Sequence, residues 1–122
     1  MNTLKGSLIA IVSSLLIAII FAFSFRLPIP MGGMLGPFGE INPYTTGNIS
    51  GVFQAVIMAW VFYGVLGGYI FIALCGGIAG FIAGKKYSGS MFKDRFILLW
   101  ASIASGAPIL FISVLDFVIG AW

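Results

Sequence analysis

The chain has 122 residues, of which 61% are hydrophobic and 7% are charged, and its mean hydropathy is +1.16. A globular chain carries about 25% charged residues to cover its surface, so this composition excludes a water-soluble domain and predicts a single membrane domain over residues 1–122. Six basic against three acidic side chains give a net charge of +3, which is too small to indicate a nucleic-acid partner.

The first apolar run covers residues 6–25. As a helix, its roughly 20 residues extend about 30 Å, which matches the hydrocarbon core of a bilayer. A basic start followed by an apolar run also fits a secretory signal peptide, but this run is longer than a usual signal core. We therefore expect a retained transmembrane helix.

Residues 26–50 form a long connection rich in proline and glycine. This composition favours consecutive turns, and we expect it to exclude helix and strand. The centre of the connection, residues 31–38, is nevertheless apolar. We expect this loop to lie on the membrane, to fold back over the helices or to dock on a partner, and we rank a lining of a pore mouth lower. The residues predicted to dock are Pro30, Met31, Met34, Leu35 and Phe38.

The second apolar run, residues 51–84, has no charged residue. One helix of this length would extend about 51 Å, which is too long for one crossing. We favour an interfacial or protruding helix over residues 51–62 and a span over residues 62–84, although one long helix stays open. Asn48 and Ser50 fit the acceptor pattern for a glycan, but we expect one of them to cap the helix that follows.

The third run contains Pro108 and predicts a span over residues 96–120. Asp94 should lie at its start, where the helix dipole favours a negative charge. Asp116 lies about 30 Å further along the helix than Phe96, so we expect it at the far interface as a solvated carboxylate. A proton or cation relay through Asp116 is the lower-ranked alternative, since acidic residues within spans are often functional.

The basic residues indicate the orientation of the chain across the membrane. The turn at residues 85–95 carries Lys85, Lys86, Lys93 and Arg95, and the N-terminus carries Lys5. Short loops rich in lysine and arginine stay in the cytoplasm. The sequence therefore predicts an all-α integral membrane protein with three transmembrane helices, in which the N-terminus and the 85–95 turn are cytoplasmic. The Gly/Pro-rich loop over residues 26–50 and the C-terminus are then outside.

Glycines repeat at multiples of four residues along the second span. They are Gly64, Gly68, Gly76, Gly80 and Gly84. Helices in lipid associate through close van der Waals contact, which a stripe of glycines permits. This glycine ladder predicts helix packing, either against the chain's own spans, which we favour, or against another subunit.

The side chains needed for catalysis are scarce. The chain has no histidine, one cysteine and three separated acids, so we expect no enzymatic activity and no cofactor or metal held by this chain alone. Our hypothesis is a non-catalytic accessory subunit of a larger integral membrane complex, whose partners are other membrane subunits and the lipid bilayer. It would pack through the glycine ladder and the loop. The alternative is a homo-oligomeric channel or transporter lined by Ser102, Ser105 and Asp116, or by the small-residue face of the second span.

Overall fold

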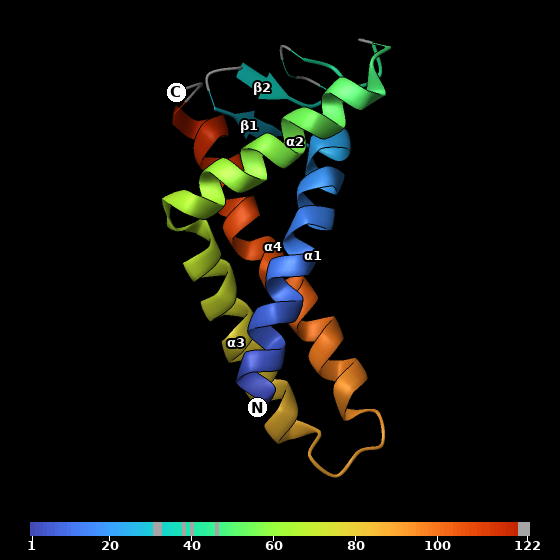
Figure 1. Ribbon diagram of the computed structural model, residues 1–122, viewed down its shortest axis with the longest axis vertical. Coiled ribbons are helices and arrows are strands. Elements are labelled where there is room, and N and C mark those ends of the chain that lie inside the picture. Colours follow the sequence, from blue (N-terminus) through green and yellow to red (C-terminus); the bar gives the residue numbers. More distant parts are fainter. Residues whose placement is uncertain (31–32, 38, 40, 46, 120–122) are drawn as a thin grey trace.

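The computed structural model describes residues 1–30, 33–37, 39, 41–45 and 47–119. Long helices run side by side as a bundle, and another helix lies across one end of it (Figure 1). Within the described residues, three helical segments are long and apolar enough to cross a membrane, as the sequence predicted. In chain order the elements are α1 (Asn2–Ser24), β1 (Leu27–Ile29), β2 (Gly33–Leu35), α2 (Ile49–Tyr63), a π-helical segment (Gly64–Gly68), α3 (Tyr69–Lys86) and α4 (Lys93–Ile119).

Helix α1 turns its small residues inward and its large residues outward. Its buried residues recur every four positions and are Gly6, Ala10, Ser14, Ala18 and Ala22. Large aliphatic side chains such as Leu8, Val12 and Leu16 are exposed on the other side. Lipid tails solvate leucine well, whereas close helix contact needs small residues, so this arrangement suits a membrane bundle.

The second apolar run consists of two helices that point in different directions. Asn48 caps α2, since its side-chain oxygen accepts a hydrogen bond from the Gly51 amide at 3.0 Å, which confirms the capping prediction. Between α2 and α3, Gly67 has a φ of +114°, a conformation that glycine adopts at little cost. The chain bends here, so α2 lies across the end of the bundle while α3 continues along it (Figure 1).

Strands β1 and β2 form an antiparallel hairpin, with Leu27 opposite Leu35 and Ile29 opposite Gly33. Our expectation that this segment contains no strand is therefore wrong. Strand β1 pairs with β2 along one edge, so a proline in β1 is tolerated when its ring faces the other edge. We call β1, β2 and the described residues up to Asn48 the hairpin cap.

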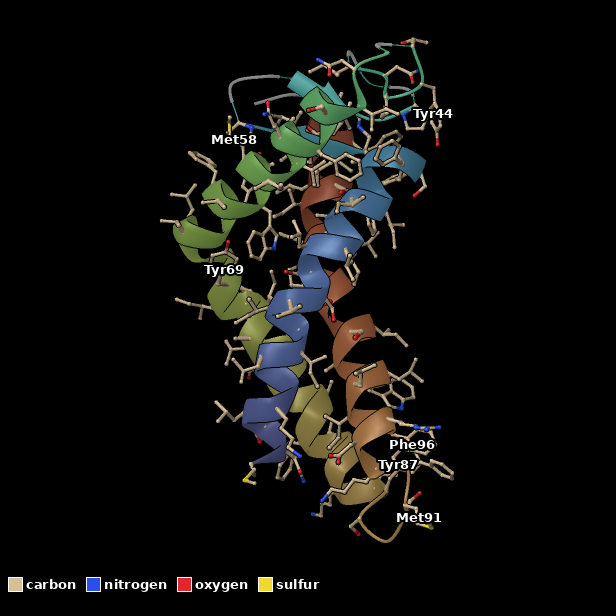
Figure 2. All side chains as sticks on the ribbon, turned by 45° about the vertical axis from the view of Figure 1, so that its right-hand side comes forward. Tyr44, Met58, Tyr69, Tyr87, Met91 and Phe96 are labelled. Carbon is tan, nitrogen blue, oxygen red and sulfur yellow. The ribbon has the colours of Figure 1, made fainter. Side chains whose placement is uncertain are left out.

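The hairpin cap folds back over the helix ends, which was one of the predicted alternatives. Tyr44, a residue of the cap (Figure 2), donates a hydrogen bond to the Phe23 carbonyl oxygen at 2.9 Å. A buried core lies beneath the cap, between it and α1, α2 and α4. The core consists of Ala18, Ala22, Leu27, Ile29, Leu35, Val52, Val56, Ala59 and Ile109.

Helix α4 begins at Lys93 with Asp94 in its first turn, as predicted. Asp94 lies 3.2 Å from the ammonium group of Lys5 at the start of α1. Both side chains are well exposed, so this ion pair adds little stability. It places the N-terminus and the basic turn at the same end of the bundle.

Candidate functional site

The glycine ladder divides into two parts with different roles. Gly76, Gly80 and Gly84 are buried against α1. A Cβ atom added at Gly80 would lie 2.8 Å from the Cα atom of Gly6 and 2.7 Å from the carbonyl oxygen of Asn2. The backbones of α1 and α3 are thus in direct contact. We expected the ladder to pack either on the chain's own spans or on another subunit. At these three glycines the structure shows packing on the chain's own helix α1.

The other two ladder residues, Gly64 and Gly68, lie in the π-helical segment. The ring of Tyr69 covers Gly64, and a Cβ atom at Gly68 would lie 2.6 Å from the Tyr63 carbonyl oxygen. These glycines make room for the bend between α2 and α3. They do not contribute to the contact with α1.

The surface of α1 that receives the ladder was not predicted. Gly6, Ala10, Ser14, Ala18 and Ala22 repeat at the same four-residue spacing as the ladder. Two small-residue stripes of equal period on different spans were therefore visible in the sequence. Pairing them would have identified α1 as the partner of α3.

Serine side chains connect α1 to the other helices. The hydroxyl groups of Ser13 and Ser102 share a hydrogen bond of 2.9 Å between α1 and α4. The indole N–H of Trp60 donates to the hydroxyl oxygen of Ser14 at 2.7 Å, which ties α2 to α1. Such bonds add modest stability in a membrane bundle.

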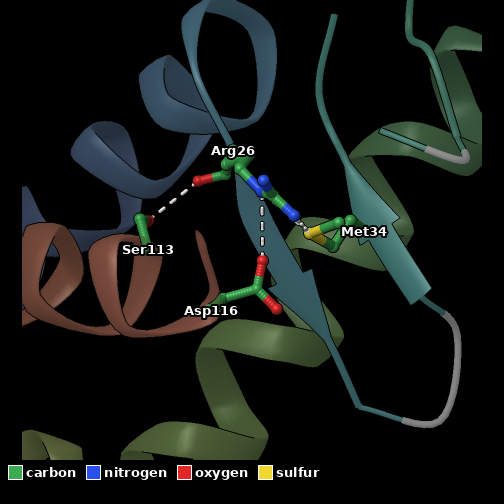
Figure 3. Close-up of polar contacts among 4 residues, drawn as sticks. All are labelled: Arg26, Met34, Ser113 and Asp116. Atoms are coloured by element: carbon green, nitrogen blue, oxygen red, sulfur yellow. Dashed lines mark hydrogen bonds and ion pairs between the residues drawn. The ribbon is translucent and has the colours of Figure 1, made fainter. Parts of the chain in front are cut away.

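An ion pair beneath the hairpin cap joins the segment that follows α1 to the end of α4 (Figure 3). The Nε atom of Arg26 lies 3.1 Å from the Oδ2 atom of Asp116, and these side chains are 17% and 1% exposed. Our expectation of a solvated Asp116 is wrong, because Arg26 and the hairpin cap cover this end of α4. Ser113, one turn earlier on α4, donates to the Arg26 carbonyl oxygen at 2.8 Å.

The Arg26 guanidinium makes two further contacts. Its Nε and Nη2 atoms contact the sulfur of Met34, and its Cζ atom lies 5.5 Å from the centre of the Phe117 ring. The Oδ1 atom of Asp116 is buried and has no hydrogen-bond partner within the described part of the chain. Arg26 therefore links β2, α4 and the end of α1. We call Arg26, Met34, Ser113 and Asp116 the clasp.

The predicted docking residues of the loop have different positions. Leu35 is fully buried in the core, so it cannot contact a partner while the cap keeps this conformation. Met34 is half-buried on Arg26, and Pro30 is half-buried at the end of β1. Met31 and Phe38 lie outside the described residues.

The clasp is suited to holding elements together. It joins one cation to one carboxylate, and no cysteine or second acid belongs to it. Within residues 1–30, 33–37, 39, 41–45 and 47–119, no group of three or more His, Cys, Asp or Glu residues could hold a metal ion. Comparison of the chain with protein-family models, curated proteins and solved structures finds no match.

Proposed function

We propose that this chain is a non-catalytic accessory subunit of a larger integral membrane complex, and that helix α2 is the surface that contacts the partner subunit. The observation that supports this role is the exposed side of α2, which is apolar except for Ser50 and Gln54 and lies on a helix without a charged residue. Its large exposed apolar residues are Ile49, Phe53, Ile57, Met58, Val61 and Phe62.

The position of α2 supports a protein partner over lipid as the cover for this side. A helix that rests at a membrane interface usually presents a strongly polar or charged face to water. Helix α2 has no charged face, since the polar residues on its exposed side are the uncharged Ser50 and Gln54. A helix that is largely apolar is more stable when it is covered on all sides. In a bilayer, lipid tails would lie parallel to the bundle helices, whereas α2 crosses these helices (Figure 1). We therefore expect a protein surface to cover α2 more completely than lipid tails would.

The surface that we propose for the partner contact, α2, differs from our first expectation, which was the glycine ladder and the loop. Gly76, Gly80, Gly84 and Leu35 are already buried within the chain, so they cannot contact a second subunit at the same time. The channel hypothesis gains no support from these contacts. Ser105 and Asp116 are buried inside a single chain, so a pore between copies could not be lined by them without rearrangement.

Site-specific photo-crosslinking in the membranes of cells that natively produce the chain would test the proposal. The probe is placed at Met58, which is 62% exposed and points away from the bundle (Figure 2). The matched control is Ile20 on α1, which is 60% exposed. We expect a defined adduct with another membrane protein from position 58 and none from position 20.

Two outcomes would contradict the proposal. No protein adduct from position 58 would show that lipid covers α2. An adduct between two copies of this chain would favour the homo-oligomeric alternative, and conductance of the reconstituted protein would then be measured.

A further inference from the structure

A groove of about 500 Å³ runs between α3 and α4. Small side chains form its floor, including Cys75, Ala79 and Ala83 on α3 and Ala104 on α4. Its volume is typical of a site for a small molecule. The glycine ladder does not line this groove, which is separate from the contact between α1 and α3 and from the exposed side of α2.

The length of the groove fits one leaflet of a bilayer. On α3 it extends from Cys75 to Lys86, and this separation corresponds to about 17 Å of helix rise. Half of a hydrocarbon core of about 30 Å is about 15 Å. A transmembrane helix of another protein would need a contact surface along both leaflets, whereas a lipid tail needs one.

One end of the groove is positively charged. Lys86 and Tyr87 line it at the end of α3, close to the basic turn. The ammonium group of Lys86 lies 5.6 Å from the centre of the Tyr87 ring, and Tyr87 stacks on Phe96 at 3.9 Å (Figure 2). These rings form a platform beneath the cation. Asp94, the acid of this turn, is already paired with Lys5.

We propose that this groove binds one phospholipid with an anionic headgroup. An acyl chain occupies the apolar groove along α3 and α4, and the phosphate lies at Lys86 and the Tyr87 hydroxyl. A lysine near a membrane surface attracts anionic lipid, and the groove adds an apolar contact that a bare surface lysine lacks. This site is independent of whether α2 contacts a partner subunit.

Protection of Cys75 from alkylation would test the site, because Cys75 lines the groove and is the chain's single cysteine. The full chain is purified in a mild detergent and treated with N-ethylmaleimide, with phosphatidylglycerol or phosphatidylcholine of the same acyl composition added. Phosphatidylglycerol should slow alkylation roughly fivefold relative to phosphatidylcholine, as expected for one lysine–headgroup contact. Inorganic phosphate should not slow it, because it leaves the apolar groove unfilled.

Two exposed lysines provide a matched pair of variants. Lys86→Gln removes the charge that lines the groove, and Lys85→Gln removes the neighbouring charge, which does not line it. Both side chains are exposed, so both variants should fold. We expect Lys86→Gln to abolish the preference for phosphatidylglycerol and Lys85→Gln to keep it. Equal protection by the two lipids in the unmodified chain, or equal loss in both variants, would overturn the proposal.

Native mass spectrometry supplies an independent readout. The chain should retain one phosphatidylglycerol molecule, and prior alkylation of the folded chain at Cys75 should reduce this retention. Unchanged retention after complete alkylation would show that lipid binds elsewhere, and this result would also overturn the assignment.

Discussion

Replacing Gly80 by alanine should push α1 and α3 apart. The new methyl carbon would lie 2.7 Å from the Asn2 carbonyl oxygen and 2.8 Å from the Gly6 Cα atom, whereas ordinary van der Waals contact begins at 3.4 Å. The two backbones must therefore separate by about 0.6–0.7 Å. A gap of this size removes about a quarter to a half of the attraction between each pair of atoms that it opens.

Gly106→Ala on α4 is the matched control. A methyl group there would meet two carbon atoms of Ile17 at 3.6 and 3.7 Å, which is ordinary contact. Both replacements gain the same helix propensity, about 1 kcal/mol, so this gain cancels when the two variants are compared. Overpacking usually costs about 1–3 kcal/mol, and we expect Gly80→Ala to be less stable than Gly106→Ala by this amount.

The assay is unfolding of the purified chain in dodecyl maltoside micelles by added sodium dodecyl sulfate. Circular dichroism and tryptophan fluorescence are followed together, because coincident transitions support a two-state analysis. The free energy of unfolding is compared among the unmodified chain and the two variants. A Gly80→Ala chain as stable as the Gly106→Ala chain would refute the backbone contact between α1 and α3.

Three further predictions use the same assay or a simple extension of it. Arg26→Met should lower the free energy of unfolding by about 3–5 kcal/mol, because it leaves the Asp116 carboxylate buried without its cation. Adding Asp116→Leu should recover most of this loss. A double variant no more stable than the single variant would contradict the ion-pair explanation. Asn48→Ala should cost about 1 kcal/mol and speed amide hydrogen exchange in the first turn of α2, and unchanged exchange would count against the cap. Lys5→Ala should leave stability unchanged at high salt, since both partners of its ion pair are exposed; a loss that persists there would show a role beyond charge.

Sequence reasoning predicted the membrane class because run length and charge depletion are local properties. Residues 6–25 contain enough apolar side chains for one crossing regardless of what they pack against. The cap at Asn48 was predictable for the same reason, since its partner amide lies three residues away. These features depend on short stretches of chain, which one sequence contains in full.

The hairpin and the ion pair could not be predicted in this way. Each strand has three residues, and its burial depends in part on residues of α2 and α4, such as Val56 and Ile109, which are distant in sequence. Arg26 and Asp116 are separated by most of the chain, and nothing in the local sequence of either residue indicates the other. The separation of Asp116 from Phe96 correctly predicted a position near the end of a helix, but Asp116 is buried there and not covered by water.

The cap and the ion pair require each other. Asp116 is buried only because the chain that follows α1 lies over the end of α4, and burial of a lone carboxylate at this site would cost several kcal/mol. Arg26 offsets this cost through its side chain and anchors the start of the hairpin through its carbonyl oxygen, which accepts the Ser113 hydrogen bond. Because one residue carries both contacts, α4 cannot leave the bundle without breaking both of these contacts to the start of the hairpin. The same cap covers the buried side of α2, so the clasp also fixes the helix that we propose as the partner surface.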